Sequence, residues 1–306
     1  YMSVCVFMQI PNMVHILIQK ILQATGNMIA PMWFQIAGVV FNFVFDPLLI
    51  FGIGPFPKMG VVGAAVATVL GYVVSTIIAL IQLFLTKQKV KPVFKNCLEP
   101  QMIKLIFSYG LPSFVMNALG AFTVNFANMF LVRYSDTAVA FFGAYFKVQQ
   151  LIFMTVNGLI QGCLPIMRFN YRAKEYGRLK QANKSGTIIA TVMMIVGMLL
   201  VLIFPKEILF LFSASEEMCA FGVPAMRIMS LGFVFSGFSA MIATYEQATD
   251  SIMPGVVVQL LRQGVLLVPV IWLLNSAVQM TGIWLAFPIT EFVTFLVAVV
   301  DRKSVV

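Results

Sequence analysis

The sequence contains very little charge. Only 10% of its 306 residues are Asp, Glu, Lys or Arg, whereas 60% are hydrophobic, and the mean hydropathy is +0.96. Soluble globular proteins carry about 25% charged and about 45–50% apolar residues, so this composition excludes a water-soluble globular domain. The apolar stretches have the length of about 20 residues that a transmembrane helix requires, and they do not alternate as the strands of a transmembrane barrel do.

Histidine is also scarce, and the cysteines form no recognisable pattern. The single histidine, His15, is expected to pack between helices, and the four cysteines show no metal or redox spacing. A zinc site built on histidine ligands is therefore not expected. The sequence has no glycine-rich ATP loop and no paired catalytic groups. We predict that the protein is not an enzyme and that it requires no cofactor.

Nine apolar stretches predict an all-α, polytopic membrane protein. They are separated by turn and cap signals such as Gly54-Pro55-Phe56-Pro57 and Ser135-Asp136. The expected spans are residues 1–22, 28–54, 60–86, 102–133, 137–167, 184–204, 219–245, 252–275 and 280–301.

The distribution of basic residues predicts how the chain is oriented. Of the twenty Lys and Arg residues, fourteen fall on one side of the nine spans, four on the other and two inside spans. Loops rich in Lys and Arg remain in the cytoplasm, so we expect a cytoplasmic C-terminus and an external Tyr1. The net charge of +9 then reflects topology, and no nucleic-acid partner is expected. We expect a multi-pass protein of the cell membrane, surrounded by lipid, without an obligate protein partner.

The chain is expected to be a fragment of two bundles. Tyr1 lies inside the first expected span, with no initiator methionine or signal peptide, so an odd number of helices should precede it. The basic stretch 86–96 (TKQKVKPVFKN) is the least apolar connection and the candidate linker between residues 1–90 and 97–306. A solvated loop that only fixes topology fits this stretch equally well.

Two short motifs recur in the same order. Gln23-Ala24-Thr25 ends the first expected span and Gln247-Ala248-Thr249 ends the seventh, 224 residues later. Gly60 and Gly282, which begin the third and ninth spans, are 222 residues apart. Internal repeats are common in secondary transporters. If spans one to three recur as spans seven to nine, the repeat has six helices, and the whole protein has twelve.

Several motifs resemble the multidrug and toxic compound extrusion (MATE) family. The matching segments are LQATGN (22–27), PM (31–32), NxxxDPLLIFG (42–52), MGVxGAAxAT (59–68), FG (142–143), GLxQG (158–162), PI (165–166), NY (170–171) and AFPI (286–289). The resemblance covers essentially the whole chain. It implies a two-lobe transporter of twelve helices, in which residues 1–90 are equivalent to helices 4–6 and residues 97–306 to helices 7–12.

Two acidic residues, Asp46 and Glu291, lie well inside expected spans, where ionisable groups mark functional sites. Asn42 and Asp46 are four residues apart and share one helix face, so their oxygens could bind Na⁺, or the carboxylate could take a proton. Thr68 of the next span could add a hydroxyl. Alternatively, Asp46 caps a helix that is kinked at Pro47. The resemblance implies a cation site at Asn42, Asp46 and Thr68, together with an aspartate of helix 1.

Glu291 is predicted to line a substrate cavity. It lies ten residues before Asp301, about 15 Å along a helix and so near mid-membrane. It could bind a cationic substrate, or form an inert buried ion pair with Lys147 or Arg262. Polar stripes on the fourth and fifth spans are predicted to line the same cavity, although interhelical hydrogen bonding is a second interpretation. The predicted cavity residues are Glu291, Lys147, Gln150, Asn157, Gln161, Asn117 and Arg262.

We expect a cation-coupled antiporter that exports amphipathic or cationic small molecules by alternating access. The coupling ion would be H⁺ or Na⁺. A lipid-linked oligosaccharide flippase of the related superfamily is the alternative, but it would need several cationic residues for a pyrophosphate, and only Lys147 and Arg262 lie inside spans. A membrane-embedded enzyme is a second alternative, for which the sequence lacks paired catalytic groups.

Overall fold

The computed structural model describes residues 9–85, 99–249 and 265–305, and within these ranges every regular element is a helix. The predicted all-α fold is confirmed. The chain divides into two compact units, residues 1–97 and 98–306. Six helices in the described ranges are long and apolar enough to cross a membrane, and two shorter apolar helices accompany them. The protein is therefore a multi-pass membrane protein.

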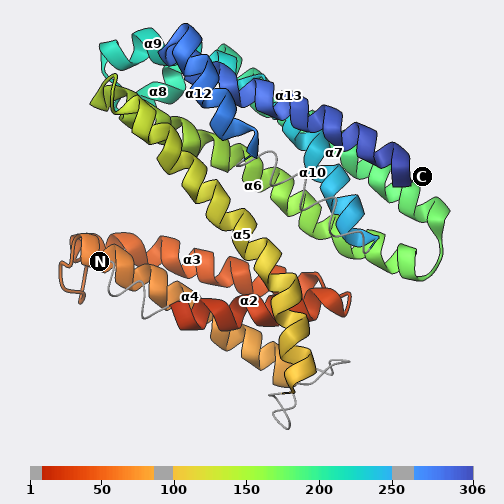
Figure 1. Ribbon diagram of the computed structural model, residues 1–306. Coiled ribbons are helices and arrows are strands. Elements are labelled where there is room, and N and C mark those ends of the chain that lie inside the picture. The colour runs from red at the N-terminus through yellow and green to blue at the C-terminus, as the bar shows by residue number, and fades with distance from the viewer. Residues whose placement is uncertain (1–8, 86–98, 250–264, 306) are drawn as a thin grey trace. The chain divides into compact units, whose positions relative to one another are not determined.

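In the first unit the described residues form three helices that lie side by side (Figure 1). They are α2 (Gln9–Ala24), α3 (Ile29–Phe51) and α4 (Val61–Leu85). The turn between α2 and α3 follows from its sequence, because Gly26 adopts a φ of 86° and Asn27 Oδ1 accepts a hydrogen bond from the amide of Ala30 at 3.2 Å. The histidine lies in this unit, where His15 packs edge-on against Phe34 with ring centroids 5.3 Å apart, as expected.

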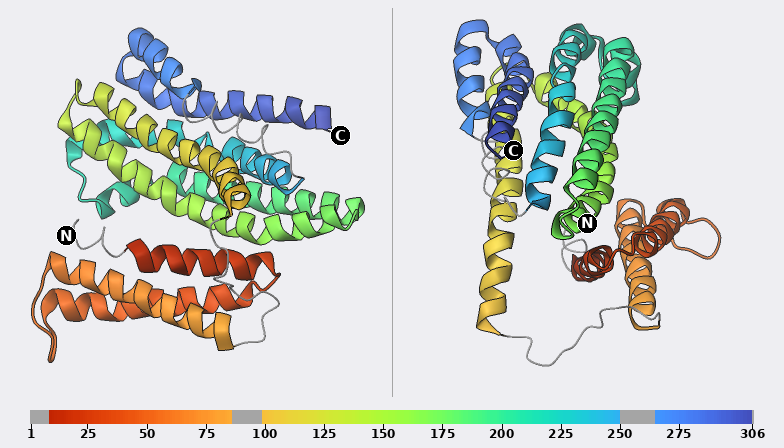
Figure 2. Two further views of the ribbon diagram at one scale, coloured as in Figure 1. Left: turned by 60° about the horizontal axis from the view of Figure 1, so that its bottom comes forward. Right: turned by 90° about the vertical axis from the view of Figure 1, so that its right-hand side faces the viewer.

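The described residues of the second unit form eight helices. They are α5 (Pro100–Leu131), α6 (Asp136–Arg172), α7 (Tyr176–Ile203), α8 (Pro205–Leu211), α9 (Glu216–Ser230), α10 (Phe233–Ala248), α12 (Leu267–Val278) and α13 (Met280–Val305). The helix α10 packs against α6, α7 and α13, while α12 and α13 form a hairpin (Figure 2). Aromatic rings fill the core between them: Phe141 and Trp284 meet edge to face at 5.3 Å, and Tyr145 stacks on Phe233.

Helix starts in this unit follow local sequence signals. The Ser135 hydroxyl accepts a hydrogen bond from the amide of Ala138 and begins α6, as the Ser135-Asp136 signal predicts. Pro205 stands at the first position of α8, where its missing N–H leaves no partner unsatisfied. The structure thus places the chain breaks where serine and proline indicate them.

Two expected spans differ from the structure. Helix α7 begins at Tyr176 rather than at residue 184, because its first turns are helical but charged, and hydropathy locates only the apolar part. The expected span 219–245 lies within one candidate membrane span, Glu216–Ala248, which is interrupted at Leu231 and Gly232 between α9 and α10. At this break the Gly232 amide donates to Met229 three residues back, so the helix tightens locally.

Some expected features lie outside the described residues. These include the candidate linker 86–96 and the first half of the expected span 252–275. The division of the chain into lobes equivalent to helices 4–6 and 7–12 of a transporter remains a prediction.

The two copies of the proposed repeat motif have similar local geometry. After α2 the hydroxyl of Thr25 donates to the carbonyl of Leu22 at 2.8 Å, and after α10 the hydroxyl of Thr249 donates to the carbonyl of Glu246 at 3.1 Å. Each threonine therefore bonds back three residues at the end of its helix. The repeat itself stays a prediction.

Candidate functional site

The structure brings Asn42, Asp46 and Thr68 together between α3 and α4. In one orientation of the Asn42 amide, its nitrogen donates to Asp46 Oδ1 at 3.4 Å and to Thr68 Oγ1 at 3.3 Å. In the opposite orientation, the nitrogen donates to Asp46 Oδ2 at 3.2 Å and the oxygen accepts from the Thr68 amide at 3.1 Å. Asn42 therefore links the carboxylate to the neighbouring helix in both orientations.

Oxygen atoms dominate this group. The hydroxyl of Thr68 donates to the carbonyl of Ala64 at 2.9 Å, so toward the group its oxygen acts as an acceptor, for the Asn42 amide or for a cation. Pro47 lies inside α3 and has no N–H, so the carbonyl of Phe43 loses its usual helical donor. Carboxylate, amide, hydroxyl and carbonyl oxygens are the ligands that hard cations prefer.

Close backbone contact holds this group in place. The helices α3 and α4 cross at Gly38 and Gly71, where a Cβ on Gly71 would lie 2.9 Å from the Gly38 carbonyl oxygen and 3.3 Å from Asn42 Cβ. Nearby, the hydroxyl of Ser75 donates to the carbonyl of Phe34 at 3.0 Å. Only glycine allows such an approach, so the crossing fixes Asn42 against α4.

The carboxylate of Asp46 has apolar surroundings but is only partly buried. Asn42, Asp46 and Thr68 are all half-buried. The rings of Phe41 and Phe45 stack at 4.1 Å on the same helix, and α3 continues past Asp46 to Phe51. Asp46 thus lies inside the helix, about 7.5 Å from its end, and its carboxylate accepts from a side chain rather than capping a helix start.

A second group surrounds Glu291 of α13. Glu291 is half-buried, and its Cγ would lie 3.3 Å from a Cβ on Gly232, so the gap between α9 and α10 accommodates its side chain. Tyr145 of α6 lies within electrostatic reach of Glu291. The Tyr145 hydroxyl is buried and has no hydrogen-bond partner among the described residues. The sequence did not single out Tyr145, because a tyrosine within a phenylalanine-rich stretch carries no distinguishing signal.

The structure describes only some of the remaining predicted cavity residues. Lys147, Gln150, Asn157 and Gln161 all lie exposed on α6. No ion pair joins Lys147 to Glu291, both of which the structure describes. Asn117 lies in α5, but its side chain is outside the described part of the chain, as is all of Arg262.

Polytopic helical architecture with carboxylates held between apolar helices is typical of membrane transporters. The sequence profile of the MatE family matches residues 112–273, more than half of the chain. The chain therefore belongs to the multidrug and toxic compound extrusion (MATE) family, whose members are transporters and not enzymes.

Relatives named multidrug export protein MepA come from two species of Staphylococcus. The protein from Staphylococcus aureus is 26% identical over 284 residues, which are 92% of this chain and 61% of the relative. The protein from Staphylococcus saprophyticus is 26% identical over 286 residues, with the same coverage. The chain thus spans about three fifths of the length of these relatives.

Solved structures of this class share the fold. A crystal structure of MATE in the bent conformation matches with a TM-score of 0.86 at 20% identity, covering 99% of this chain and 67% of the other. The outward-facing conformation of a multidrug resistance MATE family transporter matches with a TM-score of 0.81 at 21% identity, covering 91% and 62%. At this identity the likeness concerns the fold alone.

Proposed function

We propose that the protein exports amphipathic or cationic small molecules in exchange for H⁺ or Na⁺ by alternating access. The observation that carries this proposal is the group formed by Asp46, Asn42 and Thr68. It holds a half-buried carboxylate inside an apolar helix pair. Family membership and the multidrug export relatives support the export of drugs.

An ion site explains Asp46 better than a helix cap does. A carboxylate within a membrane helix is unfavourable unless it is neutralised, and Asn42, its hydrogen-bond partner, carries no charge. A bound proton or Na⁺ would supply the missing positive charge. Because the group offers a carboxylate together with neutral oxygens, it suits both ions, and their identity stays open.

The polar stripe on α6 supports a wet substrate cavity in the second unit. Lysine and amide side chains do not face hydrocarbon without a large loss of solvation free energy. Lys147, Gln150, Asn157 and Gln161 are exposed on this helix, so we propose that they line a water-filled path. Glu291 would bind the cationic part of a substrate there.

The flippase alternative is less well supported. A pyrophosphate requires several cationic groups, and inside the expected spans the sequence offers Lys147 and Arg262. The carboxylate of Glu291, which is proposed to line the cavity, favours a cationic substrate over an anionic one. We further propose a cell-membrane location with a cytoplasmic C-terminus, from the distribution of basic residues.

Export by membrane vesicles tests the proposal. Vesicles that contain the full-length protein are given a fluorescent cationic dye under a Na⁺ gradient or a proton gradient. We expect transport under at least one gradient, and a loss of about tenfold or more in Asp46→Asn. Asp136→Asn, which removes a carboxylate from the first turn of α6, is the matched control and should transport at the wild-type rate. Wild-type transport by Asp46→Asn would overturn the coupling role.

A further inference from the structure

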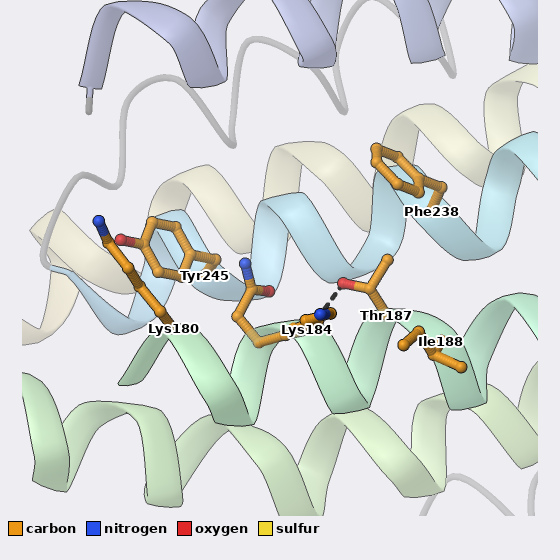
Figure 3. Close-up of a pocket in the computed structure, with 7 residues that line it drawn as sticks. Lys180, Lys184, Thr187, Ile188, Phe238 and Tyr245 are labelled. Carbon is orange, nitrogen blue, oxygen red and sulfur yellow. Dashed lines mark hydrogen bonds between the residues drawn. The ribbon is translucent and has the colours of Figure 1, made fainter. Parts of the chain in front are cut away.

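A pocket between α7 and α10 shares no residue with either group described above. Its volume is about 420 Å³, within the range of small-ligand sites. It is lined by Lys180, Asn183, Lys184, Thr187 and Ile188 of α7 and by Phe238 and Tyr245 of α10 (Figure 3). None of these seven residues is acidic. The export mechanism uses none of them, so the pocket requires a separate explanation.

The pocket is polar at one end and apolar at the other. Figure 3 shows Lys180 and the hydroxyl of Tyr245 at one end, with Ile188 and Phe238 at the other. Lys180, Lys184 and Ile188 are spaced by four residues and so follow one face of α7. A ligand that fits this arrangement has an anionic head and an apolar tail.

Asn183 provides an independent indication of a ligand. Its side chain lines the pocket and is only 4% exposed. Its Oδ1 has no hydrogen-bond partner among the described residues. A buried amide oxygen without a donor is unfavourable, and a hydroxyl on the head of the ligand could supply that donor. The pocket therefore offers cations for a phosphate and an acceptor for a hydroxyl.

The position of the pocket along α7 matches the membrane interface. The helix begins with charged residues, and its apolar run follows Lys184. This basic end is on the side that the charge distribution predicts to be cytoplasmic. Basic pockets between transmembrane helices at this level bind anionic lipid head groups.

We propose that this pocket binds an anionic phospholipid with a hydroxylated head group. The phosphate lies between Lys180 and Lys184, a head-group hydroxyl donates to Asn183, and an acyl chain follows Ile188 and Phe238. This site is independent of the proposed export function, because it involves neither Asp46 nor the polar stripe of α6.

Binding of single lipids to the purified full-length protein tests this proposal. Native mass spectrometry in neutral detergent gives the affinity for dioleoyl phosphatidylglycerol and for dioleoyl phosphatidylcholine. We expect phosphatidylglycerol to bind about tenfold more tightly. In Lys180→Gln/Lys184→Gln this preference should disappear. The matched control is Lys174→Gln/Arg178→Gln, which removes two exposed charges nearby but outside the pocket, and it should keep the preference.

Three outcomes would overturn the proposal. An equal loss in both double variants would assign the preference to the basic surface in general. Displacement of the lipid by inorganic phosphate would assign the pocket to a free anion. Ile188→Asn changes an exposed residue at the apolar end of the pocket. This variant should weaken the binding of dioleoyl phosphatidylglycerol but not that of glycerophosphoglycerol, which has the same head group without acyl chains. Unchanged binding of both by this variant would exclude the acyl chain from the pocket.

Discussion

Two carboxylates in the membrane-spanning helices have different neighbours, and their neighbours determine what each can do. Asp46 accepts a hydrogen bond from the Asn42 amide, which also links it to Thr68 of the next helix, so a carboxylate and a hydroxyl lie within one small group. Glu291 fills the gap at Gly232, and its charge acts on the buried hydroxyl of Tyr145. We therefore propose ion coupling for the first residue and substrate binding for the second.

This assignment predicts a selective effect of Glu291→Gln. Removing the charge should weaken export of a cationic dye by about tenfold, while a neutral amphipathic drug keeps its wild-type rate. The measurement compares both substrates in the same vesicles. Glu207→Gln, which neutralises an exposed carboxylate in the first turn of α8, is the control. Equal loss for both drugs would show that Glu291 does not recognise charge.

Thr68→Val tests the hydroxyl in the ion site. Valine has the same shape but no oxygen, so the ion concentration for half-maximal transport should rise by about three- to tenfold at an unchanged maximal rate. Thr155→Val is the control, since the Thr155 hydroxyl donates only to its own helix at the carbonyl of Ile152. A reduced maximal rate at an unchanged ion requirement would contradict a ligand role.

At the scale of elements, the crossing of α3 and α4 fixes the ion site. Gly38 and Gly71 let the two backbones meet one helical turn from Asn42. Because the site residues come from both helices, any separation of the pair moves Thr68 away from Asp46. The glycine contact therefore determines the site geometry, although neither glycine belongs to the site.

Gly71→Ala is predicted to destabilise the protein by about 1–3 kcal/mol, because the added methyl would meet the Gly38 carbonyl. Thermal unfolding in detergent measures the effect as a lower Tm. Gly158→Ala in α6 is the matched control, since a Cβ there meets nothing within 4 Å. It should be neutral or stabilise by about 0.5–1 kcal/mol. A similar loss of Tm in both variants would refute the close crossing.

Local patterns predicted the helices and part of the site from the sequence alone. Asn42 and Asp46 are four residues apart, so the helical period alone placed them on one face. Thr68 is 26 residues from Asn42, and its approach depends on the packing of two helices. Hydropathy likewise missed the charged start of α7 and the break at Gly232. The lipid pocket was not predicted, because its two walls meet only in the folded unit.

At the scale of the whole molecule, topology remains a prediction that labelling can test. In a cysteine-free background, Lys58→Cys lies between α3 and α4, and Arg178→Cys lies in the exposed first turns of α7. The excess of basic residues predicts that position 58 is external and position 178 cytoplasmic. A membrane-impermeant maleimide should label only the first in intact cells. Labelling of position 178 alone would reverse the orientation.

Ion movement triggered by substrate tests the central claim most directly. Proteoliposomes that contain the full-length protein carry a pH-sensitive or a Na⁺-sensitive dye, and a cationic drug is then added. Our account predicts drug-induced movement of one of these ions in the wild type and in Asp136→Asn. It predicts none in Asp46→Asn, even though this variant still binds the drug. Ion movement at the wild-type rate in Asp46→Asn would show that the carboxylate at position 46 does not couple export to an ion.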